Sequence, residues 1–156
     1  MADGPGAIRI AGVADAAGAA RLLHEFNTEY DEPSPGVAAL TETLERLIGD
    51  GEATVLLGGE GPDGIALMRI RPALWSPGQE AYLQELYVIP SRRRRGLGRA
   101  LLEATMERAR AAGAAGIDLN TGETDTEARA LYESAGFTNR EGSPDGPSML
   151  FYEREL

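Results

Sequence analysis

Hydrophobic and polar residues follow one another in segments that predict short strands and amphipathic helices. Alternation over Ala7–Val13 predicts a first strand, and apolar residues at helical spacing after Asp15 predict a helix that ends near Tyr30. We expect the Asp15 side chain to cap that helix. Two prolines and a glycine predict a loop over Asp31–Gly36, and the leucine spacing of Val37–Ile48 predicts a second helix.

The middle of the chain predicts three strands and then a third helix. Ala53–Leu57 and Ile65–Ile70 flank a glycine-rich turn, which is typical of a hairpin. Gln79–Ile89 predicts another strand, which Pro90 would end. From Gly96 onwards the apolar residues recur with a period of 3.6, which predicts an amphipathic helix.

The last part of the chain predicts a buried strand over Ile117–Thr121 and a helix over Thr126–Ser134. Phe137–Asn139 and Ser148–Glu153 then predict two more strands around a turn. This order indicates an α+β fold with a mixed sheet of six to seven strands and about four helices. The length of 156 residues favours one domain that spans residues 1–156.

Composition excludes several kinds of site. The chain has no cysteine and one histidine, which excludes disulfides, thiolate metal sites, a cysteine nucleophile and a multi-histidine metal site within one chain, so we expect no metal. No apolar run reaches the ~20 residues that span a bilayer, and the N-terminus lacks the pattern of a secretory signal. We therefore expect a cytoplasmic protein of bacterial type without a membrane partner.

Charge is distributed unevenly. All 15 basic residues are arginine, against 25 acidic residues, and the net charge is −10. Five of the arginines lie within one segment: Arg92, Arg93, Arg94, Arg95 and Arg99. The rest of the chain then carries a charge of −15, which disfavours nucleic acid as a partner. A local basic segment on an acidic protein suggests a small polyanion with several phosphates, although a solvated charge run has the same appearance.

The segment that contains these arginines runs from a predicted strand through a turn into a helix. Backbone N–H groups at a helix start have no intrahelical acceptor, and the helix dipole favours anions there. Gly96 and Gly98 would allow a ligand to approach the main chain closely. The segment is not a Walker loop, because the chain has no lysine, and it lacks the third glycine of a dinucleotide fingerprint.

Two sequence blocks carry a family resemblance. Arg93–Gly98 resembles the Arg/Gln-x-x-Gly-x-Gly/Ala motif by which GNAT N-acetyltransferases bind acyl-CoA, and it follows a hydrophobic strand and Pro90. Ala128–Phe137 is similar to a second GNAT block of the form A-x-x-LYE-x-x-GF, at the interval found in that family. The resemblance extends over essentially the whole chain and implies an acetyl-CoA-dependent enzyme. It also implies that the strand with Leu86–Val88 splays from the next strand at the cofactor site.

The resemblance implies how the cofactor binds. Residues 94–99 would offer main-chain amides to the pyrophosphate, the strand would pair with the pantetheine arm, and an N–H near Val88 would stabilise an oxyanion. Asp125 stands where the family often has asparagine, so it either contacts the cofactor or caps a helix. The predicted cofactor residues are Leu86, Tyr87, Val88, Arg93, Arg94, Arg95, Gly96, Leu97, Gly98, Arg99 and Asp125.

The resemblance also nominates two catalytic residues. Tyr132 matches the family tyrosine near the CoA sulfur, where it would help the thiol leave; the alternative is a half-buried helix residue. Glu85 is the nearest carboxylate for a general base, but some relatives place the acid one position earlier, at Gln84. One residue along a strand changes the face, so Glu85 would point away from the site unless a bulge intervenes.

The acceptor site is less defined. In this fold the loop between the first two helices and the central strands wall the cleft, which nominates Phe26, Asn27, Glu29, Tyr30, Asp31, Glu32 and Trp75. Acids and aromatic rings in this set suit a cationic amine, although acidic loops are common in so acidic a chain. His24 has either a packing role or a part in proton transfer.

We predict an N-acetyltransferase that moves acetyl from acetyl-CoA to a primary amine, a small molecule or a peptide, by direct attack. No residue pattern supports a covalent acyl-enzyme. The alternative is a regulatory module that binds acyl-CoA and has little or no activity. Members of the resembled family are often dimers, which makes a homodimer the expected assembly.

Overall fold

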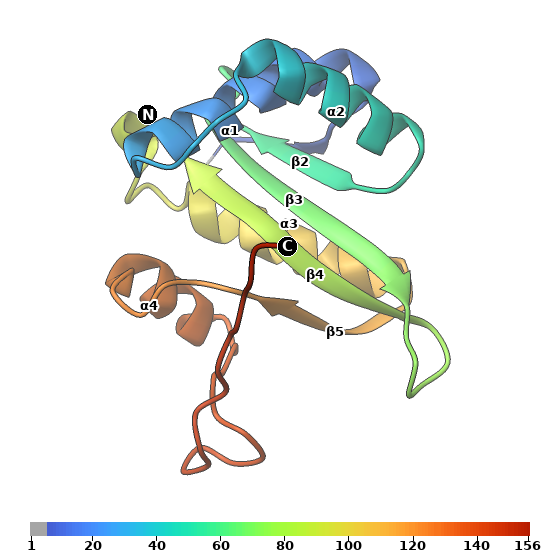
Figure 1. Cartoon of the computed structure of the whole chain (residues 1–156), viewed down its shortest axis with the longest axis vertical. Helices are drawn as coiled ribbons and strands as arrows, with labels where there is room; N and C mark the ends of the chain where they lie inside the picture. The colour runs from blue at the N-terminus through green and yellow to red at the C-terminus, as the bar shows by residue number, and fades with distance from the viewer. Residues whose placement is uncertain (1–5) are drawn as a thin grey trace. The chain divides into compact units, whose positions relative to one another are not determined.

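The computed structural model describes residues 6–156, which form five strands and four helices (Figure 1). The elements are β1 (Ile8–Ile10), α1 (Ala16–Glu29), α2 (Val37–Gly49), β2 (Thr54–Gly58), β3 (Gly64–Pro72), β4 (Gln79–Val88), α3 (Leu97–Ala111), β5 (Ala114–Leu119) and α4 (Thr126–Ser134). Short 3₁₀ turns cover Val13–Asp15 and Pro90–Arg92. The chain packs as two units, Met1–Leu119 and Asn120–Leu156.

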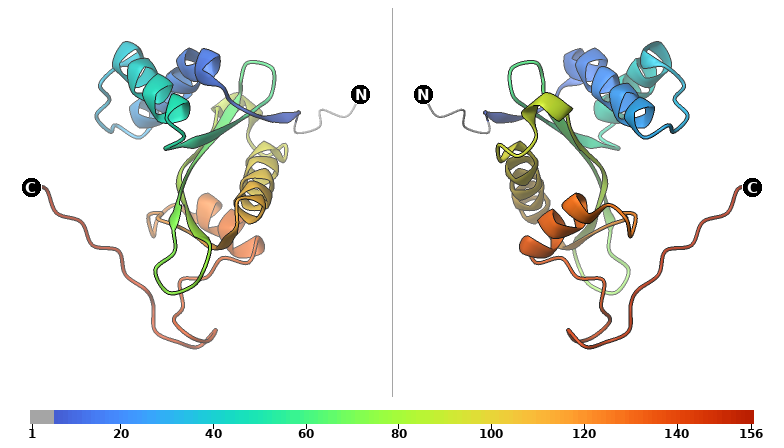
Figure 2. Two further views of the ribbon diagram at one scale, coloured as in Figure 1. Left: turned by 90° about the vertical axis from the view of Figure 1, so that its right-hand side faces the viewer. Right: turned by 90° about the vertical axis from the view of Figure 1, so that its left-hand side faces the viewer.

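The first unit is built on one mixed sheet with the strand order β1-β2-β3-β4-β5. The first four strands are antiparallel, whereas β5 runs parallel to β4 because α3 forms the crossover between them. Helices α1 and α2 cover one face of the sheet and α3 covers the other (Figure 2). The predicted α+β fold and mixed sheet are confirmed.

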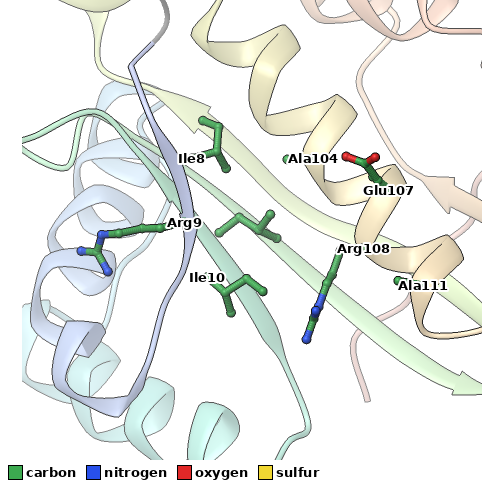
Figure 3. Close-up of a pocket in the computed structure, with 8 residues that line it drawn as sticks. Ile8, Arg9, Ile10, Ala104, Glu107, Arg108 and Ala111 are labelled. Carbon is green, nitrogen blue, oxygen red and sulfur yellow. The ribbon is translucent and has the colours of Figure 1, made fainter.

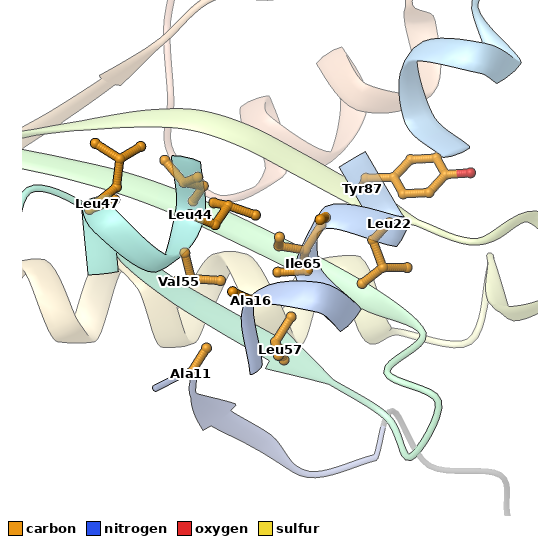
Figure 4. Packing of buried hydrophobic residues seen from close by; sticks show 13 residues of the cluster. Ala11, Ala16, Leu22, Leu44, Leu47, Val55, Leu57, Ile65 and Tyr87 are labelled. Carbon is orange, nitrogen blue, oxygen red and sulfur yellow. The ribbon is translucent and has the colours of Figure 1, made fainter. Parts of the chain in front are cut away.

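Alternating side chains of the central strands fill two apolar layers. Val55, Leu57 and Ile65 pack with Leu22 of α1 and residues of α2 on one face (Figure 4). On the other face, Met68 of β3 packs with β4 and with α3. Each fully buried side chain of this size stabilises the fold by ~1.5–3 kcal/mol. Because successive side chains of a strand point to opposite faces, the alternating apolar residues of the central strands supply both layers.

A pair of glycines brings α3 close to the sheet. Gly58 and Gly64 face each other across β2 and β3. A Cβ at Gly58 would lie 2.6 Å from Leu97 Cδ1, and a Cβ at Gly64 would lie 2.8 Å from Leu101 Cδ1. Leu97 and Leu101 are buried. The start of α3 therefore packs directly against the backbone of the two glycines, and the N-terminus of α3 is fixed beside the end of β4.

The sheet differs from the prediction in its strand number, which is five and not six to seven. The strands predicted over Phe137–Asn139 and Ser148–Glu153 are wrong: within residues 120–156 only an isolated bridge joins Arg140 to Ser148. Met149 donates its N–H to Asn139, but Pro147 has no N–H to offer and no ladder continues. The apolar side chains after it stay exposed, so no packing stabilises a sheet there.

Two smaller predictions near the N-terminus also need correction. The first strand covers only Ile8–Ile10, with one further hydrogen bond from the Ala11 N–H to the Val55 carbonyl, because a 3₁₀ turn begins at Val13. Asp15 does not cap α1 with its side chain; its carboxylate accepts the N–H of Gly12 at 2.8 Å and pairs with Arg9 at 2.9 Å. Asp15 therefore stabilises the 3₁₀ turn that precedes the helix.

The glycine pair generates a stability prediction. Gly64→Ala should lower the free energy of unfolding by about 1–3 kcal/mol, because the added methyl group collides with Leu101. Urea denaturation measures this, with Gly116→Ala in β5 as the matched control, since nothing lies within 4 Å of a Cβ there. Equal stability of the two variants would show that α3 does not depend on the close approach.

Candidate active site

The C-terminal half of β4 has a free outer edge. Pairing between β4 and β5 ends at Leu83 and Leu119, whereas β4 continues to Val88 and pairs with β3 alone. Among residues 6–156 no other strand lies along this edge. The two strands thus separate where the sequence analysis expects an opening for the cofactor.

The backbone of Val88 faces this free edge. The N–H of Ile89 donates to the carbonyl of Asp63 at 2.9 Å, toward β3. In a planar trans peptide the Val88 carbonyl then points the opposite way, and there it accepts a hydrogen bond from Arg93 Nε at 2.9 Å. In an extended strand the N–H of a residue points to the same side as its carbonyl. The Val88 N–H therefore faces the opening as a hydrogen-bond donor.

A tight turn leads from β4 to the N-terminus of α3. Arg94 and Gly96 have φ values of 62° and 86°, both left-handed. For an arginine this conformation costs ~1–2 kcal/mol, so contacts on both sides must hold the turn. Ala100 donates to the Gly96 carbonyl at 3.0 Å, and the four N–H groups of residues 96–99 precede this first helical bond. These N–H groups and the helix dipole favour an anion.

The arginines of this turn do not share one role. Arg93 Nη2 donates to Glu29 Oε1 at 2.8 Å, and its side chain is 31% exposed. Arg92 lies 3.7 Å from a carboxylate oxygen of Asp63. Arg94, Arg95 and Arg99 are exposed residues of the turn and the first helical turn. Arg92 and Arg93 thus point back onto acids of neighbouring elements, and Arg99 lies 3.9 Å from Glu103 on its own helix.

A β-bulge turns Glu85 toward α1. Leu83 pairs with Met68 and Glu85 pairs with Leu67, so Gln84 is an extra residue in β4. Leu67 belongs to the layer under α1 and α2, and its cross-strand partner Glu85 shares that face. Burial raises the pKa of the Glu85 carboxyl above its ordinary value. The bulge supplies the change of face on which a role for Glu85 depends.

Tyr87 connects β4 to the C-terminal turn of α1. The residue is 5% exposed, and its ring stacks on Phe26 with centroids 4.8 Å apart. Its hydroxyl donates to Glu29 Oε1 at 2.9 Å and points away from the core cluster (Figure 4). Burial, followed by the Glu29 carboxylate, raises the pKa of Tyr87 to about 12, so the hydroxyl remains protonated. The hydrogen bond from Arg93 keeps the pKa of Glu29 below its usual range.

Side chains of α1 hold the loop between α1 and α2. Asn27 Nδ2 donates to the Pro33 carbonyl at 2.6 Å, and His24 Nδ1 lies 2.8 Å from Ser34 Oγ. Among the other residues predicted for the acceptor, Tyr30, Asp31 and Glu32 are exposed on this loop and the helix end. His24 therefore has at least the structural role of holding the loop.

Trp75 is not brought to this site. It is 94% exposed in the loop that joins β3 to β4. That loop follows the Pro72–Gln79 pair, whereas the free edge ends at the Gly64–Val88 pair. The two ends of this hairpin lie about 30 Å apart at ~3.3 Å per residue, so the acceptor role predicted for Trp75 finds no support in the fold.

Tyr132 and Asp125 belong to the second unit, Asn120–Leu156. Asp125 Oδ1 accepts the N–H of Ala128 at 3.2 Å, which confirms the alternative that this residue caps α4. Tyr132 is half-buried, and its ring lies edge-on to Phe137 with centroids 5.9 Å apart. The catalytic role of Tyr132 stays a prediction.

A shallow groove lies elsewhere, between β1 and α3 (Figure 3). Its lining consists of Ile8, Arg9, Ile10, Leu56, Ala104, Glu107, Arg108 and Ala111. None of these residues belongs to the two sequence blocks or to the predicted acceptor set. The groove offers mainly apolar side chains and no backbone donors from a helix start, so we place the candidate site at the free edge of β4.

Known proteins match both the sequence and this fold. Residues 19–137 match the model of the Acetyltransferase (GNAT) family. The chain belongs to the GNAT acetyltransferase family. It is therefore an acyltransferase, and acetyl-CoA is the usual cofactor of its family.

Individual relatives agree with this assignment. An uncharacterized N-acetyltransferase of Bacillus subtilis, YhfO, is 28% identical over 86% of this GNAT chain and 91% of its own length. Mycothiol acetyltransferase of Clavibacter michiganensis is 36% identical over 67% of this chain, which matches only 33% of that protein. The crystal structure of a protein from Arthrobacter sp. FB24, provisionally assigned as an acetyltransferase, has 46% identity and a TM-score of 0.88 over 96% of each chain.

The residues at the free edge fit the cofactor of a GNAT protein. The α3 N-terminus provides donors for phosphate oxygens, and the outer edge of β4 provides backbone groups for an extended amide-containing arm. Within residues 6–156 no three His, Asp or Glu side chains gather as metal ligands would. Over the same residues, no helix has the length and apolar character needed to cross a bilayer.

Proposed function

We propose that this GNAT protein transfers an acetyl group from acetyl-CoA to a primary amine by direct attack. The observation that carries the proposal is the free edge of β4, which ends beside the N-terminus of α3 and carries a carboxylate at its bulge. A donor edge, an anion site and a base candidate thus come from one strand and the helix that follows it.

Acetyl-CoA supplies the acyl group as a thioester. The main-chain amides of residues 94–99 would bind the pyrophosphate, and the backbone of Leu86, Tyr87 and Val88 would pair with the pantetheine arm. The Val88 N–H, which faces the opening, would donate to the carbonyl oxygen as negative charge develops on it. This donor is fixed before any ligand arrives, so no reorganisation is needed during the reaction.

Glu85 is the proposed general base. An alkylamine with a pKa of ~10.4 must lose a proton to attack near pH 7, at a cost of ~4.6 kcal/mol. Because burial raises the pKa of Glu85 above its ordinary value, its carboxylate is a stronger base than an exposed glutamate. The bulge at Gln84 puts this carboxylate on the face covered by α1.

The loop after α1 is proposed to attract a cationic acceptor through Asp31 and Glu32, which are exposed there with Tyr30. Glu29 contributes less to this attraction than the sequence suggests, because Arg93 neutralises it at 2.8 Å. Phe26 lies on the same helix end, but its ring is engaged with Tyr87 and Tyr30.

Activity and cofactor binding test the proposal together. The protein should release CoA when acetyl-CoA and a suitable member of a primary-amine panel are both present, and calorimetry should show CoA binding. Gly98→Val should abolish that binding, because its side chain would cover the N–H groups at the start of α3. Ala111→Val, at the exposed far end of the same helix, is the matched control and should bind as the wild type does.

Two outcomes would contradict the proposal in different ways. Undiminished CoA affinity in folded Gly98→Val would place the cofactor elsewhere. CoA binding without turnover of any amine would favour the alternative of a regulatory acyl-CoA-binding module.

Glu85→Gln should lower kcat by about 100-fold or more while the shape of the side chain is kept. A carboxyl group whose pKa is raised loses its charge as the pH falls through that raised value, so kcat/KM of the wild type should fall there. The variant should lack this acid limb. Glu52→Gln, which removes a carboxylate from an exposed ion pair with Arg46, serves as the control. An unchanged pH profile in Glu85→Gln would exclude Glu85 as the base.

Tyr132→Phe tests the proposed acid near the leaving thiol. The change deletes only the hydroxyl, so kcat should fall about 10–100-fold while CoA affinity changes little. Tyr152→Phe, an exposed tyrosine of the same unit, should turn over as the wild type does. Wild-type kcat in Tyr132→Phe, with chemistry rate-limiting, would show that Tyr132 has a structural role.

A further inference from the structure

Arg93 makes three contacts within the protein, although it is the first residue of the cofactor motif. Its Nη2 donates to Glu29 on α1 at 2.8 Å, and its Nε donates to the Val88 carbonyl on β4 at 2.9 Å. The guanidinium also lies 5.5 Å from the centroid of the Tyr87 ring, where a cation–π contact forms. One planar side chain thus joins the turn to both a helix and a strand.

Glu29, the carboxylate that accepts the hydrogen bond of Arg93, is itself held in place. Tyr87 donates its hydroxyl to Oε1 of Glu29, the same oxygen that Arg93 uses, at 2.9 Å. Tyr87 is fixed in turn by the stack on Phe26, with an interplanar angle of 10°. Glu29 therefore receives two donors whose directions are set by buried or half-buried neighbours.

The turn that Arg93 holds has a backbone conformation that contacts on both sides must stabilise. It contains left-handed Arg94 and Gly96 within three residues, before the N–H groups at the start of α3. On the helix side, Leu97 and Leu101 hold it against the glycine pair. On the strand side, Arg93 holds it to Glu29 and to Val88, whose N–H faces the opening.

We propose that Arg93 is a positioning residue and not a phosphate ligand: its ion pair with Glu29 fixes the cofactor turn and the Val88 backbone in the geometry that binds CoA. The proposal rests on the proposed function, since it concerns the same cofactor site. It makes Glu29 and the Tyr87 hydroxyl part of the cofactor site without contact to the cofactor.

The direction in which one substitution changes the Kd of CoA distinguishes a positioning role of Arg93 from charge attraction. Glu29→Gln removes a negative charge near the binding site of a polyanion, so electrostatics alone would strengthen CoA binding. If the ion pair positions the turn, the same change must weaken CoA binding. The two roles of Arg93 thus predict opposite shifts in Kd.

The experiment measures the Kd of CoA by calorimetry at one ionic strength for the wild type, Glu29→Gln, Arg93→Gln and the double variant. We expect each single change to weaken binding about three- to tenfold, the range for a partly exposed charged hydrogen bond. The double variant should be no weaker than Arg93→Gln alone, because both changes break the same pair. Tighter or unchanged binding in Glu29→Gln, or additive effects of the two changes, would overturn the proposal.

Two further variants keep the test decisive. Arg93→Lys retains the charge, but a lysine lacks the planar guanidinium that donates to Glu29 and Val88 together. This variant should therefore bind CoA as weakly as Arg93→Gln. Wild-type affinity in Arg93→Lys would indicate a phosphate contact and overturn the proposal. Glu52→Gln, with the same change in net charge at a distant ion pair, should keep the wild-type Kd. A loss there equal to that of Glu29→Gln would show that the weaker binding does not depend on the contact with Arg93, and would overturn the proposal too.

Failure of the proposed function would look different, since the wild type itself would then show no CoA binding. Thermal unfolding of each variant confirms that it is folded before its Kd is compared. If Arg93→Gln does not fold, the direction of the change in Kd for Glu29→Gln tests the proposal on its own.

Discussion

The candidate site depends on the contact between the first turn of α3 and two glycines of the sheet. Leu97 and Leu101 occupy the space that side chains at Gly58 and Gly64 would fill. Because buried side chains are close-packed, this contact leaves the helix start little freedom. The N–H groups that precede Ala100 are therefore presented beside the end of β4, where the strand has lost its outer partner.

The bulge at Gln84 has a second effect on the same strand. Before it, Leu83 faces the layer under α3, and after it Tyr87 faces the layer under α1. In a regular strand without a bulge, Leu83, Glu85 and Tyr87 would share one face, because side chains alternate with a period of two. The bulge thus lets β4 pack a leucine on one side and then direct a glutamate and a tyrosine to the other, so that packing and candidate chemistry use different parts of one strand.

The arginine segment shows that a run of like charges need not have one function. Arg92 and Arg93 lie near Asp63 and Glu29, which reduces the positive charge available to a ligand. The contacts of Arg93 connect the end of α1 with the end of β4, two elements that are far apart in the chain. An interpretation of the segment as a uniform phosphate site would miss this connection.

The sequence by itself determined the features that depend on short spacings. Apolar periodicity gave α1, α2 and α3 and the central strands, and the two sequence blocks identified the family that residues 19–137 match. Glycines in the turn and the start of α3 also follow from neighbouring residues, because helix starts and left-handed turns are local. The two C-terminal strands were predicted wrongly, since an apolar pattern does not supply the pairing partners that a strand needs.

Only the tertiary structure decided the face of Glu85 and the partner of Arg93. The face depends on the register between β3 and β4, and one bulged residue reverses it. Glu29 lies 64 residues before Arg93, and the two meet because α1 packs on the sheet beside Tyr87. Such contacts depend on how distant elements pack and not on any spacing within the chain, which is why the sequence could name Arg93 and Glu29 but assigned them to different ligands.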